Sequence, residues 1–249
     1  MTTRASLRQQ GEAMRQRLFG DDDGAPALMR PLNTEASYGG IWSRPGLALE
    51  DRMICALAAL AAVQRLPKLR RHAGAALQLG LTPRAIVEVL IQIGIYAGFA
   101  ASEEAVEAVT AEFAARRVAM PDEPERADSL EVLTERGRKL MEQLHGDRAV
   151  QGYAAPDNAV TGALYPLAIQ YGYGEIWFRP GLDLRQRALV AVAAFTALKL
   201  GQVQKFGESA LNMGLSRTEV IEAVIQTAPF SGFAPALNAL GALSSALTD

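Results

Sequence analysis

Apolar residues recur at helical spacing along most of the chain. Ile86, Val89, Leu90 and Ile93 fall on one face of a helix, because positions three or four apart share a face. The stretch 53–63 is almost entirely small and apolar, which indicates a buried helix too short to cross a bilayer. No segment alternates apolar and polar residues over the length of a strand. The pattern therefore predicts an all-α fold.

Turn residues divide the apolar pattern into separate helices. A helix is expected over about 68–79, ended by Gly80, a favoured residue just beyond a helix. The next helix is expected to start at Thr82, a good N-cap that is followed by proline at the first helical position. In the second half of the chain, residues 216–219 form the same kind of corner, with a serine and a glutamate spaced as a capping box.

The chain contains one unit twice. The segment YGGIWSRPGL at 38–47 recurs 135 residues later as YGEIWFRPGL at 173–182. The segment ALQLGLT at 76–82 recurs as ALNMGLS at 210–216. Self-similarity at a fixed period indicates that each copy forms one structural unit. The repeat therefore predicts two helical units of the same architecture.

The duplication covers nearly the whole chain. The amphipathic segment 11–20 resembles 137–146, so even the openings of the two units correspond. Between the units, the segment 121–128 is rich in proline and charge, as exposed linkers are. We therefore predict a first unit over 1–120 and a second unit over 129–249.

These motifs, in this order, resemble the γ-carboxymuconolactone decarboxylase family. The shared features are the Gly-Glu-Ile-Trp-x-Arg-Pro-Gly-Leu string, the helix of small residues, and the segment His-x-x-x-Ala-Leu-x-x-Gly-Leu-Thr. The resemblance implies two tandem repeats of the alkylhydroperoxidase-D-like fold. It also implies a ring of six units, which is a homotrimer of this two-unit chain. The namesake reaction is a cofactor-free decarboxylation of an unsaturated lactone acid in aromatic degradation.

The chain departs from its relatives at two positions. Thiol peroxidases of the same superfamily use a Cys-x-x-Cys pair on the second helix, whereas Cys55 is the only cysteine here. Peroxidase chemistry by that mechanism is therefore excluded. Cys55 aligns with Val190, which favours a small buried apolar role. Lys68 stands where the decarboxylases often carry a glutamate, four residues before the histidine of the second helix.

The resemblance singles out His72 and Glu175 as catalytic candidates. His72 occupies the family's functional position, and its counterpart in the second unit is Phe206. Glu175 belongs to the Gly-Glu-Ile-Trp string, and its counterpart is Gly40. Each unit keeps one half of the pair, which predicts a composite site, within one chain or between neighbouring chains, with His72 as proton carrier and Glu175 as its assistant. The structural alternatives are an ordinary helix histidine for His72 and, for Glu175, a charge at a helix N-terminus or an ion pair with Arg179.

Five further residues are candidates for substrate binding. Arg44 and Arg179 could grip a carboxylate, although their retention in both units favours a structural role. Trp42 and Trp177 are interpreted as core or interface anchors more than as substrate walls. Tyr96, aligned with phenylalanine, could place a hydroxyl in the site of the first unit.

Composition and charge limit the kinds of molecule that the protein is expected to bind. A formal charge of −2 argues against a nucleic-acid binder, and the charged N-terminus lacks the apolar core of a signal peptide. A cytoplasmic protein that binds neither membrane nor nucleic acid is expected. The two histidines have no metal-site spacing, so no metal and no cofactor are expected. His145 is expected at the surface, and 21–24 is expected to be a solvated turn.

The leading prediction is a cofactor-free lyase for a small acidic substrate, an unsaturated lactone acid or keto acid, in aromatic catabolism or biosynthesis. An isomerase or cyclase that uses the same carbanion chemistry is an alternative. A catalytically silent binding or scaffold protein is the rival from another class, because neither unit carries the full family pattern.

Overall fold

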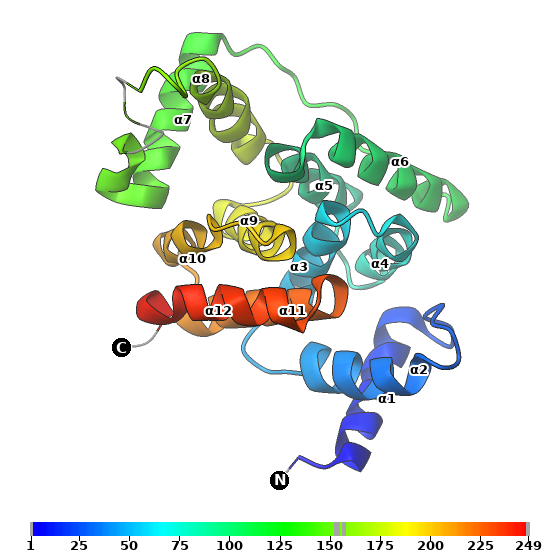
Figure 1. Ribbon diagram of the computed structural model, residues 1–249. Helices are drawn as coiled ribbons and strands as arrows, with labels where there is room; N and C mark the ends of the chain where they lie inside the picture. Colours follow the sequence, from blue (N-terminus) through cyan, green and yellow to red (C-terminus); the bar gives the residue numbers. More distant parts are fainter. Residues whose placement is uncertain (1, 152–154, 156–157, 248–249) are drawn as a thin grey trace.

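The computed structural model describes residues 2–151, 155 and 158–247, and every regular element among them is a helix (Figure 1). The all-α prediction is confirmed. The first unit comprises α1 (Arg4–Phe19), α2 (Arg30–Leu32), the π-helix η1 (Asn33–Trp42), α3 (Leu49–Ala62), α4 (Leu66–Gln78), α5 (Pro83–Ala97) and α6 (Phe99–Ala115).

The second unit repeats this order. It comprises α7 (Leu130–His145), the short 3₁₀ helix η2 (Gly146–Val150), α8 (Tyr165–Leu167), the π-helix η4 (Ala168–Glu175), η5 (Ile176–Phe178), α9 (Leu184–Leu198), α10 (Val203–Asn212), α11 (Arg217–Ser231) and α12 (Phe233–Leu247). Residues 118–129 have no regular structure. The boundary at 121–128 stays a prediction.

The predicted helix starts are confirmed at two equivalent corners. The Thr82 hydroxyl accepts a hydrogen bond from the Ala85 N–H at 3.1 Å, at the start of α5. The Ser216 hydroxyl accepts one from the Glu219 N–H at 3.2 Å, which forms the predicted capping box of α11. Local sequence therefore sets where these helices begin.

Glycines allow a π-helix to cross closely over the first helix of each unit. The sequence analysis had not predicted these π-helices. Gly39 in η1 lies against α1, where an added Cβ would be 2.1 Å from the carbonyl oxygen of Leu7. Gly174 in η4 lies against α7 in the same way, 2.1 Å from the carbonyl oxygen of Leu133. A side chain cannot fit at such distances, so the repeated Tyr-Gly motif is explained by backbone contact.

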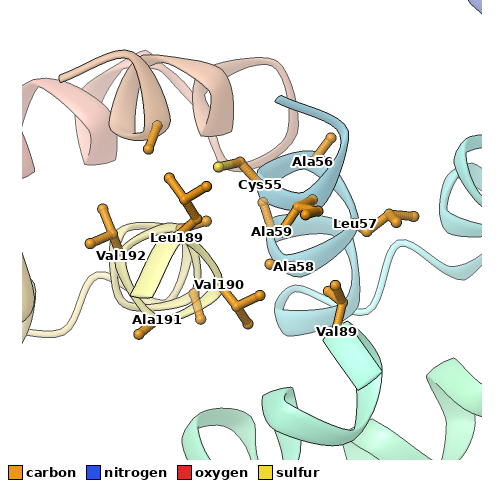
Figure 2. Close-up of a cluster of buried hydrophobic side chains, with 14 of the residues drawn as sticks. Cys55, Ala56, Leu57, Ala58, Ala59, Val89, Leu189, Val190, Ala191 and Val192 are labelled. Atoms are coloured by element: carbon orange, nitrogen blue, oxygen red, sulfur yellow. The ribbon is translucent and has the colours of Figure 1, made fainter. Parts of the chain in front are cut away.

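The two units share one hydrophobic core. Helices α3 and α9 pack against each other at its centre, while α1 and α7 lie at opposite corners of the molecule (Figure 1). Cys55 and Ala59 lie on the side of α3 that faces Leu189 of α9, and all three are buried (Figure 2). Helix α5 also packs on α9, and α11 on α3. Each unit's third predicted helix therefore packs on the central helices of both units.

No helix within the described ranges has both the length and the apolar character needed to span a membrane.

Candidate functional site

His72 lies in a buried aromatic cluster closed by both units. Its ring is edge-on to Phe19 at 5.0 Å between centroids and to Phe230 at 5.2 Å, and it is 6.2 Å from Trp42. Phe19 ends α1 and Trp42 ends η1, whereas Phe230 comes from α11 of the second unit. Contact between the two units therefore completes the surroundings of His72. We call these four residues the His72 cluster.

The hydrogen bonding of His72 determines where its proton lies. Its Nδ1 is 2.8 Å from the backbone carbonyl of Lys68. A carbonyl can only accept, so Nδ1 carries the proton and Nε2 has a free lone pair. Burial lowers the pKa of His72 to about 4, and the nearby charge of Lys68 also lowers it. Near neutral pH the resting His72 is therefore neutral and acts as a proton acceptor.

Trp42 adds a donor to the same cluster. Its side chain is buried, and its Nε1–H has no hydrogen-bond partner in the described part of the chain. An unsatisfied buried donor costs about 1–3 kcal/mol, so an oxygen atom placed there would be favoured. The cluster thus offers one acceptor, Nε2 of His72, and one unused donor, Nε1 of Trp42.

Asp23 and Tyr38 form a buried polar pair in the first unit. The Asp23 carboxylate accepts from the Tyr38 hydroxyl at 2.9 Å and from the Ala25 N–H at 3.0 Å. The Lys68 ammonium is 3.4 Å from the Asp23 carbonyl. Burial alone would raise the pKa of Asp23, but these hydrogen bonds and the Lys68 charge outweigh it and lower that pKa. The turn at 21–24 was expected to be solvated, but its Asp23 is buried because the Tyr38 side chain packs against it.

A cationic pocket of about 400 Å³ borders the His72 cluster at Phe19. Arg70, Arg71 and Arg116 line it, and the opposing carboxylates are those of Asp22 and Glu112. Glu112 pairs with Arg116 at 2.8 Å and with Arg70 at 3.6 Å, while Arg71 has no ion pair within the described ranges. The three positive charges exceed the two negative ones, so the pocket favours an anion.

The second unit holds an equivalent cluster in which histidine and phenylalanine are exchanged. Phe206 takes the place of His72, and His145 takes the place of Phe19. The rings of His145 and Phe206 are edge-on at 5.1 Å, almost as His72 and Phe19 are. His145 is only 7% exposed, which corrects its predicted surface position. The likeness of 11–20 to 137–146 was the signal that paired His145 with Phe19.

Tyr96 belongs to this second cluster and not to the site of the first unit. Its ring lies 4.7 Å from Phe195 and 6.3 Å from Phe206, and its hydroxyl accepts from Gln92 Nε2 at 3.1 Å. The buried Trp177 indole N–H approaches this hydroxyl without a regular hydrogen bond. Within the chain Tyr96 therefore does not lie at the site of the first unit as expected, because the end of α5 reaches the second unit.

Glu175 is not brought to His72. It ends η4 and binds Arg126 through both oxygens, at 2.5 and 3.2 Å. With Arg136 and Arg179 it lines a separate pocket of about 330 Å³ that His72 does not line. The Glu175 carboxylate faces the irregular segment between the units, and this orientation removes the composite site within one chain. A joint site between chains stays a prediction.

Arg44 is occupied by an ion pair between the units. Its guanidinium binds the Glu222 carboxylate at 2.7 Å, and the fully buried Arg52 binds the same carboxylate at 2.8 Å. Arg52 also donates to Gln226 Oε1 at 3.2 Å. The structural interpretation of Arg44 is favoured over a free carboxylate grip, because its fork is already filled.

Arg179 repeats this arrangement in the second unit. It pairs with Glu88 of α5 at 3.1 Å and with Glu123 at 2.9 Å, and Arg187 binds Glu88 at 3.1 Å. Both halves of the chain therefore use an Arg-Pro-Gly arginine to bind the third predicted helix of the other half. The predicted Arg179–Glu175 ion pair is replaced by these contacts.

Other reactive groups are buried or scattered. The Cys55 thiol is buried, and burial raises its pKa, so a reactive thiolate is disfavoured. No three His, Cys, Asp or Glu side chains gather as a metal site among the described residues.

Known proteins resemble the chain in sequence and fold. A 4-carboxymuconolactone decarboxylase of Acinetobacter baylyi is 36% identical over 70 residues, 28% of this chain and 52% of that protein. The chain thus matches about half the length of this relative. A nitrosuccinic acid decarboxylase of Metarhizium robertsii is 25% identical over 118 residues, 47% of this chain and 82% of that protein.

The solved structures include a gamma-carboxymuconolactone decarboxylase subunit from Burkholderia xenovorans. It superposes with a TM-score of 0.55 at 21% identity, over 99% of this chain and 98% of that one, which supports the predicted fold. The sequence model of the carboxymuconolactone decarboxylase family matches 28–111 and again 163–245. These two matches cover more than half of the chain, one in each unit, and the protein therefore belongs to the carboxymuconolactone decarboxylase family.

Proposed function

We propose that the protein is a cofactor-independent decarboxylase that acts on a small organic acid at the His72 cluster. The observation that carries this proposal is that the free Nε2 lone pair of His72 and the unused Nε1–H of Trp42 belong to the same aromatic cluster, with ring centroids 6.2 Å apart. The adjoining cationic pocket supports an acidic substrate. Both curated relatives are named as decarboxylases of carboxylic acids, which supports the reaction class.

The reaction follows from the placement of these groups. The bond between the carboxyl carbon and its neighbour breaks, CO₂ leaves, and the electron pair stays on the neighbouring carbon. A carbonyl or nitro oxygen of the substrate accepts this charge and receives the hydrogen bond of the Trp42 Nε1–H. A proton from Nε2 of His72 then completes the carbon.

His72 acquires that proton when the acid binds. The resting ring is neutral, because burial lowers its pKa to about 4. An anion placed against the ring raises the pKa of His72, since an opposite charge favours the protonated form. Substrate binding therefore takes up a proton, and the affinity for the acid falls as the pH rises.

Proton abstraction is the second candidate reaction. The resting state of His72 is a base, which suits removal of a proton from a carbon acid and its return to another carbon. Such an isomerase would release no CO₂ and would exchange substrate hydrogen with solvent deuterium.

A homotrimer is proposed for the assembly. Phe99 is 61% exposed and its counterpart Phe233 is 62% exposed, so both units leave the same apolar position uncovered. Leu32 and Leu167 form a second exposed pair of counterparts. Equivalent apolar positions on both units are what a closed ring of units would bury.

The test compares wild type with His72→Phe. Phe206 occupies the equivalent helix position, so phenylalanine is expected to pack there. We expect CO₂ release from 4-carboxymuconolactone or nitrosuccinate to fall by about 10²-fold or more with the melting temperature little changed. The matched control, Cys55→Ser, should keep full activity. Undiminished turnover in His72→Phe, or no CO₂ from either acid with wild type, would overturn the proposal.

A further inference from the structure

The second unit has kept a histidine in its aromatic cluster, at a position different from that of the first unit. His145 comes from the end of α7, whereas His72 comes from α4. Each histidine is edge-on to a phenylalanine, with nearly the same separation in the two clusters. Histidine and phenylalanine have thus swapped positions between the two clusters. The imidazole comes from a different helix in each unit, but each cluster keeps one histidine–phenylalanine contact.

Two hydrogen bonds fix the tautomer of His145. The Ser209 hydroxyl lies 2.8 Å from the carbonyl of Lys205 and 2.8 Å from Nδ1 of His145. The carbonyl can only accept, so the hydroxyl proton goes to Lys205 and the oxygen accepts from Nδ1–H. Nε2 of His145 therefore has a free lone pair, as Nε2 of His72 does.

This lone pair is buried and unused. Nε2 of His145 is enclosed and has no hydrogen-bond partner within the described ranges. A buried acceptor without a partner is costly, so a hydrogen-bond donor placed at Nε2 would be stabilised. In the described part of the chain, the two histidines are therefore alike in offering an acceptor inside an aromatic cluster.

The charges near His145 favour an acid as the ligand. Arg148 and Lys205 are the nearby cations, and together with burial they lower the pKa of His145 to about 4. Glu208 is the carboxylate on this side, and it is held in an ion pair with Arg148. On the other side of Phe206 lies Tyr96, whose hydroxyl is neutral. The surplus charge around His145 is positive. A carboxylic acid would supply both the negative charge that balances these cations and the proton that Nε2 can accept.

We propose that the second unit holds a second binding site for a small carboxylic acid, in which His145 takes the role that His72 has in the first. The class of ligand rests on the proposed function. The occupied site has the acid hydrogen-bonded at Nε2 of His145, with the proton shared between them and the cations of Arg148 and Lys205 near the carboxylate.

Because the chain contains only two histidines, each can be followed separately by nuclear magnetic resonance. We would titrate succinate into the full chain labelled in its histidine rings, and assign the two signals with His72→Phe and His145→Phe. Phe19 occupies the position equivalent to His145, so phenylalanine is expected to pack there. Both signals should shift saturably, each with a raised pKa, and calorimetry should count two acids per chain. Succinamide, which has no charge, should shift neither signal.

Variants separate this inference from the proposed function. His145→Phe should bind one succinate per chain and leave the His72 response intact. Ser209→Ala, which places at 209 the residue that Ala75 provides in the first unit, should weaken the His145 response by about tenfold, because the tautomer is no longer fixed. A response of His72 alone in wild type overturns the second site and leaves the proposed function standing. A response of neither histidine contradicts both.

Discussion

The buried Arg52–Glu222 ion pair makes Glu222→Ala the sharpest test of how the units hold together. The Arg52 side chain is 1% exposed and the Glu222 side chain 4% exposed. Removal of the carboxylate leaves the Arg52 guanidinium buried without a counter-charge, which costs about 3–5 kcal/mol. In a chain of this size each kcal/mol lowers the melting temperature by about 2–4 °C, so a fall of roughly 6–20 °C is expected.

Thermal unfolding followed by circular dichroism measures this effect at one fixed chain concentration, since assembly shifts the apparent stability. Glu104→Ala, an exposed glutamate on α6, is the matched control and should lie within about 0.5 kcal/mol of wild type. The pair Arg52→Met with Glu222→Leu removes both charges and should recover most of the loss. A single variant within 1 kcal/mol of wild type, or a double variant no better than the single, refutes the reasoning.

Two further predictions concern pH and assembly. The pKa of both His72 and His145 is about 4 in the folded protein and about 6.5 in the unfolded chain. The unfolded chain therefore binds more protons between these values, so each histidine should cost about 3 kcal/mol of stability as pH falls from 6.5 to 4. The melting temperature, measured at a series of pH values between 6.5 and 4, should fall accordingly. If the same fall persists in the double variant His72→Phe, His145→Phe, the two histidines are not its cause. For a chain of 26.7 kDa, light scattering should give about 80 kDa, and a stable monomer at micromolar concentration would contradict the trimer.

The sequence was sufficient for the fold because its signals are local and repeated. The cap at Thr82 and the capping box at Ser216 each act within one turn of helix, and both are present as predicted. The repeat then supplied the tandem architecture. The π-helices were not predictable, since their glycines serve contacts with a distant carbonyl, as Gly39 does with Leu7.

The candidate site was predicted less well, because its neighbours come from the other unit. Tyr96 and Arg44 were assigned by their place in the repeat, but both contact residues of the opposite half, because α5 and α11 pack on both units. Asp23 resembled a solvated residue in an acidic run until the Tyr38 hydroxyl placed it in the interior. His145 was within reach of the sequence, since the aligned openings of the two units put it opposite Phe19.

The packing of α5 and α11 on both units also constrains how the sequences of the two units could diverge. In an assembly of identical single units, one substitution in the gene alters every copy of a cluster at once. Covalent fusion gives each cluster its own codons, so His72 and Phe206, or Phe19 and His145, can differ while the shared frame persists. Because the ends of α5 and α11 reach the opposite unit, a codon change in one half, such as at Tyr96 or Phe230, takes effect in the cluster of the other half. A change in either half therefore acts on both, and neither half could be removed without exposing the core that the two share.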